Sequence, residues 1–442
     1  MHLRPLYPPG KRKALKLILV LILLLLLAGA VTIPFLWESS SLWYKFGGDK
    51  RLLQTGKIAG LFAAVLVFLQ ILLASRLILF DRTFGLDKVY FFHQLNGFAL
   101  AGLALLHPFL VLIPEGIDNL PIGWKFWPEM VGATTLLLLV IVIFTASLKK
   151  GFIPYHLWRI VHRPMGYLLL IGMGVHVLTV SDSFGQDVPR HSFFLVAGIV
   201  LLCVITHTFR TIRDALRYFN ISNISPISDK VISLEIKAPT SFSFAPGQFV
   251  FLRLIGHTVS TEPHPFTIAS SPDKNETLQF MIKKCGDWTS KLDAGAVFKA
   301  AIEGPFGLFS YKARPVASHM VLIAAGIGIT PMISMLRQLS TEEKQPRLML
   351  LWSLRRKNEF FLHDELRNLK NELSSLEVHL LFSREKKGRR ISCKLLGNLL
   401  PSFPRTSHFY ICGPEQMMVE TGKNLQKLGF MGKNIFRERF SL

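Results

Sequence analysis

Charge is scarce in this sequence. Of its 442 residues 18% are charged, whereas average globular proteins have about 25%, and 50% are hydrophobic with a mean hydropathy of +0.37. This composition excludes disordered and collagen-like chains, and it is too apolar for an ordinary soluble protein. We therefore expect part of the chain to lie in a membrane.

The charge that is present is mostly basic, because 29 acidic residues stand against 51 Lys and Arg, a net charge of +22. In an apolar chain this excess fits cytoplasmic loops that face anionic lipid, so we predict a lipid membrane and no nucleic acid as partner.

Cysteine is equally scarce. Cys203, Cys285, Cys393 and Cys412 lie too far apart for a zinc ribbon or a disulfide framework, so any metal must have other ligands.

Long apolar runs are absent from the second half of the chain, but six occur before position 212. Each has roughly the 17 to 25 residues that a bilayer requires. We predict membrane spans at 17–37, 58–80, 89–113, 130–148, 160–180 and 193–209. The first run has a second interpretation as a signal peptide, because basic residues precede it and Ala28-Gly29-Ala30 resembles a cleavage site, but the run continues well past that point.

The loops between the predicted spans differ in charge. The loops from span two to three and from span four to five, and the segment after span six, carry Arg76, Arg82, Lys88, Lys149, Lys150, Arg159, Arg163, Arg210, Arg213 and Arg217. The loops from span three to four and from span five to six carry Glu115, Asp118, Glu129, Asp182 and Asp187. The loop from span one to two, with Lys45, Lys50, Arg51 and Lys57, is mixed and weakens this contrast. Because positive charge collects on the cytoplasmic side, we predict that both termini, and everything after residue 220, are cytoplasmic.

Two patterns divide the remaining half of the chain. Short alternating β-rich runs separated by Pro and Gly occupy 231–305 and predict a small antiparallel barrel. From His319 onward strands alternate with helices, which indicates a parallel α/β nucleotide-binding sheet. We therefore expect a multi-domain membrane protein with a six-helix transmembrane bundle at 1–220, an antiparallel β-barrel at 221–315 and an α/β domain at 316–442.

Four histidines lie inside two predicted spans, where an ionisable group is costly. Span three contains His93 and His107, span five contains His162 and His176, and the members of each pair are 14 residues apart. In a helix 14 residues make about four turns and rise about 21 Å, so each pair lies on one face at two depths. Spans three and five run in the same direction, which brings His93 level with His162 and His107 level with His176. Two facing imidazoles can ligate a haem iron, so we predict two stacked haems.

These histidines have another interpretation. Polar groups inside a membrane also bond neighbouring helices or relay protons, and the bundle would then be a histidine-lined proton or metal transporter without haem. The matched spacing on two parallel spans favours haem. Arg76 and Arg163 lie near the cytoplasmic ends of predicted spans. They can pair with haem propionates, or they can simply be positive charges that set the membrane topology.

One β-rich segment has the residue types that a flavin needs. His264-Pro265-Phe266-Thr267 offers a flat aromatic ring, a hydroxyl and backbone donors in consecutive positions, although an ordinary buried strand has the same composition. Downstream, Gly286 and Thr289 can bring backbone amides and a hydroxyl to a pyrophosphate at a helix start, or form a turn before a capped helix.

Two loops of the α/β half suit a nicotinamide dinucleotide. The segment 326–331 follows an apolar strand and opens a helix, where glycines let backbone approach phosphate; a tight turn is the alternative. After the next strand, Arg355 and Arg356 stand where a ribose 2′-phosphate should lie. We therefore predict that NADPH is preferred over NADH, unless these residues form a solvated basic turn.

Together these motifs carry a family resemblance. The chain resembles the ferric reductase and NADPH oxidase superfamily, in which a six-span di-haem domain is joined to a ferredoxin–NADP reductase-like module. The resemblance is carried by HPFTIASS (264–271), GDWT (286–289), EGPFG (303–307), AAGIGITP (324–331) and CGP (412–414). The match covers nearly everything from residue 56 onward, and the motifs are specific jointly rather than singly.

The resemblance assigns roles to individual residues. It implies that FAD is held by His264, Pro265, Phe266 and Thr267, and its pyrophosphate by Gly286 and Thr289. It implies that the dinucleotide is held by Gly326, Gly328, Thr330 and Pro331, and that Cys412 approaches the nicotinamide. Phe440 corresponds to the family's near-terminal aromatic that covers the flavin, although two residues follow it here.

The resemblance also implies a function. NADPH reduces FAD in the cytosol, and electrons then pass singly over two b-type haems to an external acceptor. We expect O2, giving superoxide, because outer loops of roughly ten to twenty residues are too short for a dedicated ferric-chelate pocket. Ferric iron and an electron-accepting protein are the alternatives. The lack of a calcium-binding extension implies a compact prokaryotic form in a bacterial inner (plasma) membrane.

Overall fold

The computed structural model describes residues 6–116, 121–148, 155–237, 242–256, 259–272, 277–286, 288–293, 297–385 and 388–438. It divides into two compact units. One consists of Met1–Lys13, Asp81–Asp87 and Arg210–Leu442 and contains both sheets. The other consists of Ala14–Phe80 and Lys88–Phe209 and contains most of the long helices.

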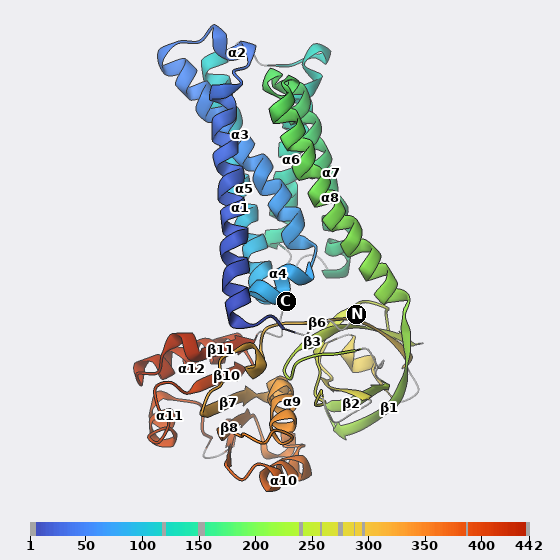
Figure 1. Ribbon diagram of the computed structural model, residues 1–442. Coiled ribbons are helices and arrows are strands. Elements are labelled where there is room, and N and C mark those ends of the chain that lie inside the picture. Colours follow the sequence, from blue (N-terminus) through green and yellow to red (C-terminus); the bar gives the residue numbers. More distant parts are fainter. Residues whose placement is uncertain are drawn as a thin grey trace. The chain divides into compact units, whose positions relative to one another are not determined.

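Six helices in the described residues are long and apolar enough to cross a membrane, which confirms the six predicted spans (Figure 1). They are α1 (Pro9–Leu36), α3 (Gly47–Ala74), α5 (Leu86–Glu115), α6 (Trp127–Leu148), α7 (Tyr155–Val180) and α8 (Asp187–Leu216). Several extend beyond the apolar run, because a helix continues to satisfy its own backbone groups in the interfacial region.

The apolar run at 58–80 is not one helix. α3 ends at Ala74, Arg76 takes a positive φ of 39°, and the short helix α4 (Ile78–Phe84) follows. A residue in the left-handed region cannot continue a right-handed helix.

A second short helix is α2 (Ser40–Trp43), and 3₁₀ turns lie at Trp124–Phe126, Asp182–Gly185, Thr289–Lys291, Tyr311–Ala313, Gly326–Ile329, Lys357–Glu359 and Gly432–Asn434.

The core of the helix bundle is built around α3. This helix buries Ala63, Ala64, Val67, Phe68 and Ile71, and Leu100 of α5, Leu139 and Val142 of α6, Leu169 and Met173 of α7 and Val200 of α8 belong to the same cluster. Small side chains let helices approach closely in a membrane. α3 is therefore packed with the two helices that carry the four histidines.

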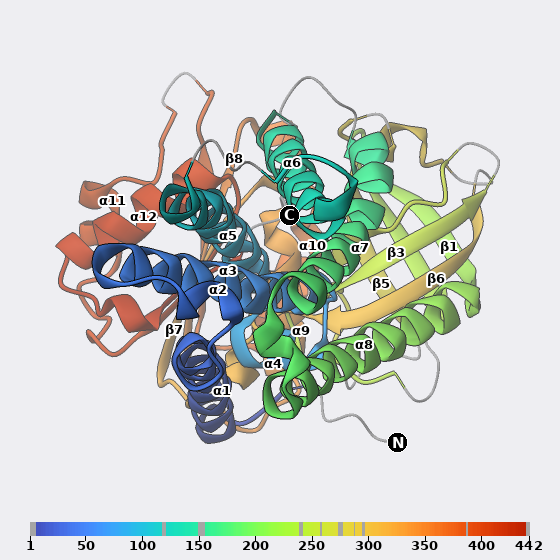
Figure 2. The same ribbon diagram turned by 90° about the horizontal axis from the view of Figure 1, so that it is seen from above.

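An antiparallel sheet of six strands follows the last long helix (Figure 2). Its strands are β1 (Tyr218–Ser228), β2 (Val231–Lys237), β3 (Phe249–Gly256), β4 (His264–Thr267), β5 (Thr277–Lys283) and β6 (Val297–Phe306), in the order β4-β3-β6-β1-β2-β5. The antiparallel prediction is confirmed. β1 lies upstream of the predicted first strand, because its many polar residues and Pro226 give no strong strand signal.

A parallel sheet of five strands completes the chain. Its strands are β7 (His319–Ala325), β8 (Arg347–Leu354), β9 (Leu376–Phe382), β10 (His408–Cys412) and β11 (Ile435–Glu438), in the order β11-β10-β7-β8-β9. The strand order reverses between β7 and β10. In such folds ligands bind beside the strand ends at this reversal. The predicted parallel α/β arrangement is confirmed, and β11 is an additional strand.

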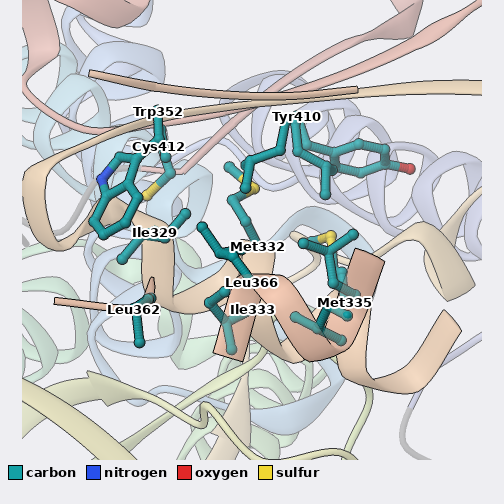
Figure 3. Packing of buried hydrophobic residues seen from close by; sticks show 14 of the residues in the cluster. Ile329, Met332, Ile333, Met335, Trp352, Leu362, Leu366, Tyr410 and Cys412 are labelled. Carbon is teal, nitrogen blue, oxygen red and sulfur yellow. The ribbon is translucent and has the colours of Figure 1, made fainter. Parts of the chain in front are cut away.

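Helices cover both faces of the parallel sheet. Residues of α9 (Thr330–Leu339) and α10 (His363–Glu372) pack with Trp352, Tyr410 and Cys412 on one face (Figure 3). Residues of α11 (Cys393–Leu399) and α12 (Glu415–Lys427) pack on the other face with Val321 and Ile323. The strand ends are thereby held by a core on each side of the sheet.

Candidate functional site

The four predicted membrane histidines form two pairs between α5 and α7. The ring centres of His93 and His162 are 6.4 Å apart, and those of His107 and His176 are 6.3 Å apart. Two imidazoles that bind one metal from opposite sides have ring centres about 6 Å apart, because each metal–nitrogen bond is about 2 Å long and each ring centre lies about 1 Å behind its nitrogen. Both pairs have the spacing that one iron atom requires.

The His107–His176 pair is fixed by backbone carbonyls. Nδ1 of His107 lies 2.7 Å from the carbonyl oxygen of Gly56 in α3, and Nδ1 of His176 lies 3.0 Å from that of Pro128 in α6. A carbonyl oxygen can only accept, so each Nδ1 donates. With its proton on Nδ1, each neutral ring keeps at Nε2 the lone pair that a metal needs.

The His93–His162 pair has different neighbours. The side-chain nitrogen of Gln70 in α3 lies 3.2 Å from Nε2 of His93 and donates to the His93 carbonyl oxygen at 3.0 Å. Asn96 donates to Oε1 of Gln70 at 2.6 Å, and Trp158 stacks on His162 with ring centres 4.4 Å apart. Gln70 and Asn96 were not predicted as site residues, although an amide inside an apolar span is a usable signal.

The donor set of each pair fits haem. Among the described residues, no three His, Cys, Asp or Glu side chains converge as a metal-binding group. A zinc-type ion needs three or four protein ligands. Haem iron already has its porphyrin nitrogens, so two axial histidines are sufficient protein ligands.

The strand predicted to hold the flavin is β4, at one edge of the antiparallel sheet. Thr267 is buried, whereas His264, Pro265 and Phe266 are partly exposed. Trp288 lies against this strand, with its ring centre 4.1 Å from that of His264 and 6.0 Å from that of Phe266. The strand and the GDWT segment, which are distant in sequence, therefore form one aromatic surface that can stack on a flat ligand.

The predicted pyrophosphate segment is a tight turn. Gly286 has a φ of +86°, which explains the glycine, and Asp287 lies outside the described residues. The Thr289 hydroxyl donates to the Cys285 carbonyl oxygen at 2.6 Å and accepts from the Cys285 amide at 2.8 Å. A three-residue 3₁₀ helix follows in place of an α-helix, so the local bonds of Thr289 close the turn.

The predicted dinucleotide loop lies at the reversal of strand order. A Cβ on Gly328 would overlap the backbone of Cys412 and Gly413, so glycine is required for the loop after β7 to touch the loop after β10. The indole nitrogen of Trp352 donates to the Gly326 carbonyl oxygen at 3.0 Å, and this hydrogen bond fixes the start of the loop to β8.

The start of α9 lies directly behind this loop. Thr330 and Pro331 are both buried, and the Thr330 hydroxyl donates to the carbonyl oxygen of Ile327 at 2.9 Å. These two buried residues therefore support the loop from the protein interior, whereas Gly326 and Ile327 line a cavity.

That cavity, of about 260 Å³, has a basic lining. Its charged residues are Arg355, Arg356 and Arg384, which follow β8 and β9, Lys230 in the turn between β1 and β2, Lys283 at the end of β5, and Asp229 and Glu359. The Glu359 carboxylate accepts from the backbone amide of Arg355 at 3.1 Å. Five cations against two acids give the cavity a net positive lining, which suits an anionic ligand. The predicted 2′-phosphate residues line the same cavity as Gly326 of the predicted dinucleotide loop.

Cys412 is fully buried at the end of β10. Its thiol donates to the carbonyl oxygen of Glu438 at 3.5 Å, and burial raises its pKa well above the ordinary value, so the thiol is protonated. Burial and the nearby carboxylates Asp87 and Asp81 also raise the pKa of Glu438. Phe440, predicted to cover the flavin, lies outside the described residues.

Three family models match the chain. The ferric reductase like transmembrane component matches residues 59–173, the FAD-binding domain matches 216–324 and the oxidoreductase NAD-binding domain matches 322–423. The first range contains His93, His107 and His162, and His176 lies three residues beyond its end. The second contains β4 and Trp288, and the third contains the loop at 326–331 and the two arginines after β8.

Individual proteins are similar to parts of the chain. The heavy chain of a superoxide-generating NADPH oxidase from Dictyostelium discoideum is 28% identical over 316 residues, which are 60% of this chain and 43% of that protein. NADPH oxidase 5 from Homo sapiens is 26% identical over 342 residues, 63% of this chain and 42% of that protein. This chain thus spans less than half the length of either relative.

Among solved structures, a ferredoxin NADP+ reductase from Neisseria gonorrhoeae with bound FAD and NADP is 20% identical, with a TM-score of 0.45. The match covers 51% of this chain and 98% of that one. By its domain content the present chain joins a ferric reductase-like transmembrane component to an FAD-binding domain and an oxidoreductase NAD-binding domain, and NADPH oxidases are among its homologues.

Proposed function

We propose that this chain transfers electrons across a membrane, from cytosolic NADPH through FAD and two b-type haems to an acceptor on the opposite side. The observation that carries the proposal is the geometry of the two histidine pairs, with ring centres 6.4 and 6.3 Å apart. When bound, FAD converts a hydride into single electrons and the haems conduct these electrons through the bilayer.

The chain's own residues hold and orient these groups. His93 and His162 would hold one haem, and His107 and His176 would hold the other. When bound, each haem would accept and pass on single electrons. In the part of the chain that follows the long helices, the partly exposed aromatic surface formed by β4 and Trp288 receives the flavin ring.

The basic cavity receives the nucleotide. Gly326 and Ile327 line this cavity and would face the phosphates. Arg355 and Arg356 lie after β8, where the ribose 2′-phosphate binds in folds of this kind. Guanidinium groups bind phosphate in a bidentate way, which favours NADPH over NADH. Arg384 adds a third guanidinium to the same lining.

We place the protein in a bacterial inner membrane with both termini in the cytoplasm. The support is the basic character of the loops that carry Arg82 and Arg159, and of the segment after span six. This orientation puts the nucleotide cavity on the side where NADPH is available.

O2, reduced to superoxide, is the acceptor we propose first. The outer loops are short, and a small apolar gas needs no built pocket. Ferric iron is the second candidate, favoured by the family description of the transmembrane component. An electron-accepting protein is the third.

One experiment separates these possibilities. The purified protein, loaded with haem and FAD, is reduced anaerobically by NADPH and followed by haem absorbance, and then receives O2 or a ferric chelate. We expect reduced haem bands and rapid reoxidation by O2 with superoxide formation. Rapid reoxidation by the chelate without oxygen, with a micromolar KM, would select ferric iron, and a protein without haem absorbance would instead support a transporter.

A further inference from the structure

Two glycines of the helix bundle lie directly against imidazole rings. A Cβ on Gly60 of α3 would lie 2.8 Å from Nδ1 and 2.9 Å from Cε1 of His107. A Cβ on Gly132 of α6 would lie closer still to the same two atoms of His176. Real Cβ atoms essentially never approach another heavy atom within 3.0 Å, so neither ring can keep its place beside a larger residue.

Each of these glycines stands four residues after the carbonyl that binds the same ring. His107 donates to the carbonyl oxygen of Gly56, and His176 donates to that of Pro128. In an α-helix the side chain of residue i+4 leans toward the N-terminus and lies over the carbonyl of residue i. Glycine at i+4 therefore uncovers the second lone pair of that carbonyl and lets an imidazole reach it.

The same arrangement occurs on two helices, one beside each member of the pair. We propose that Gly56 with Gly60, and Pro128 with Gly132, form two carbonyl–glycine seats that position His107 and His176. The inference rests on the proposed function, because haem is the group that these histidines would hold. Each seat fixes the Nδ1–H tautomer and the rotation of its ring, and directs Nε2 toward the iron.

A bond from Nδ1–H to a carbonyl also makes the imidazole a stronger electron donor to the metal. The seats therefore tune one haem and leave the other unchanged. The His93–His162 pair has Gln70 and Trp158 as its neighbours instead. A change in either seat should alter the spectrum and reduction potential of a single haem.

The test uses Gly132→Ala and Gly60→Ala in the full-length protein. Haem per FAD is counted, both midpoint potentials are titrated, and the ferric EPR spectrum is recorded. We expect Gly132→Ala to lower the haem content from two toward one per FAD. We expect Gly60→Ala, whose added methyl overlaps less, to keep both haems and to raise the midpoint potential of one. Flavin reduction by NADPH should be unchanged in both variants.

The bundle offers matched controls. A Cβ on Gly102 of α5 or Gly198 of α8 would meet nothing within 4 Å, so alanine at these positions should leave both haems unchanged. A Cβ on Gly172 of α7 would overlap the Thr135 hydroxyl of α6 without touching a histidine. Gly172→Ala should therefore lower thermal stability without changing either potential.

The outcomes separate the inference from the function on which it rests. Unchanged haem content, potentials and EPR spectra in both Gly60→Ala and Gly132→Ala would overturn the inference, as would a change in Gly172→Ala equal to that in Gly132→Ala. Gly60→Ala decides the matter if Gly132→Ala does not fold. Absence of haem from the wild-type protein would instead overturn the proposed function.

Discussion

The two regions that carry the candidate chemistry align their residues by different rules. In the helix bundle, residues 14 positions apart come to one helix face because the period and rise of an α-helix are fixed. In the parallel sheet, Gly326, Arg355 and Cys412 come to one edge because each follows or ends a strand. Spacing along the chain is therefore enough to align residues on one face of a helix, whereas a site on a sheet depends on strand order, which spacing does not contain.

The largest expected effect tests the helical rule. His107→Ala and His176→Ala each remove one axial ligand of the same proposed iron, so each should lower the haem content from two to one per FAD while flavin reduction by NADPH continues. Haem is counted by its pyridine complex, with His207→Ala in α8 as a control that should keep both haems. Two retained haems in both ligand variants would show that the 14-residue spacing has no such meaning.

The next effect tests the sheet edge. A charge-assisted hydrogen bond contributes about 1.5–3 kcal/mol, so Arg355→Ala with Arg356→Ala should lower the NADPH/NADH ratio of kcat/KM by roughly 10- to 100-fold or more. The loss should arise from NADPH, with NADH kinetics nearly constant. Arg367→Ala, an exposed arginine on α10, serves as control. An unchanged ratio in the double variant would mean that these arginines form a solvated turn.

A smaller effect separates the two histidine pairs. Gln70→Leu removes the amide that donates to the His93 carbonyl oxygen, and the loss of one hydrogen bond of about 0.5–1.5 kcal/mol corresponds to a shift of roughly 20–60 mV in a one-electron potential. We expect the potential of one haem to fall, because amide hydrogens near the ligand favour the added electron. Gln94→Leu, at an exposed position of α5, is the control. A shift in the haem of His107 and His176 would contradict this assignment.

The fold was predictable wherever periodicity is strong. The six spans, the antiparallel sheet and the parallel sheet all follow from apolar runs and alternation. The exceptions have local causes. The run at 58–80 gave no sign that Arg76 takes a positive φ, and β1 and β11 were missed because a polar strand and a four-residue strand carry weak patterns.

Much less of the candidate site's surroundings was predictable. The four histidines were identified from spacing, but Gly60 and Gly132 are ordinary small residues of a membrane helix until the facing ring is known. The cavity likewise brings Lys230 and Lys283, next to or in strands of the antiparallel sheet, together with Arg355, which follows a strand of the parallel sheet. A sequence shows which residues share an element, whereas these contacts depend on the packing of different elements.

The smallest effect concerns a buried acid in the unit that contains the sheets. Asp81 is buried and accepts hydrogen bonds from the amides of Gly307 and Leu86, yet burial outweighs these bonds and raises its pKa to about 7. The folded protein thus holds a proton that the unfolded chain has already released, so the free energy of unfolding should fall as the pH rises from about 4 to about 7. Glu438 contributes with the same sign. Asp81→Asn should flatten part of this slope, measured as Tm of the detergent-solubilised protein between pH 5 and 8, whereas the exposed Asp364→Asn should not. If Asp81→Asn kept the wild-type dependence of Tm on pH, the Asp81 carboxyl would be ionised in the folded protein over this whole pH range. Its hydrogen bonds would then outweigh the cost of burial, as hydrogen bonds do for the polar histidines of the bundle.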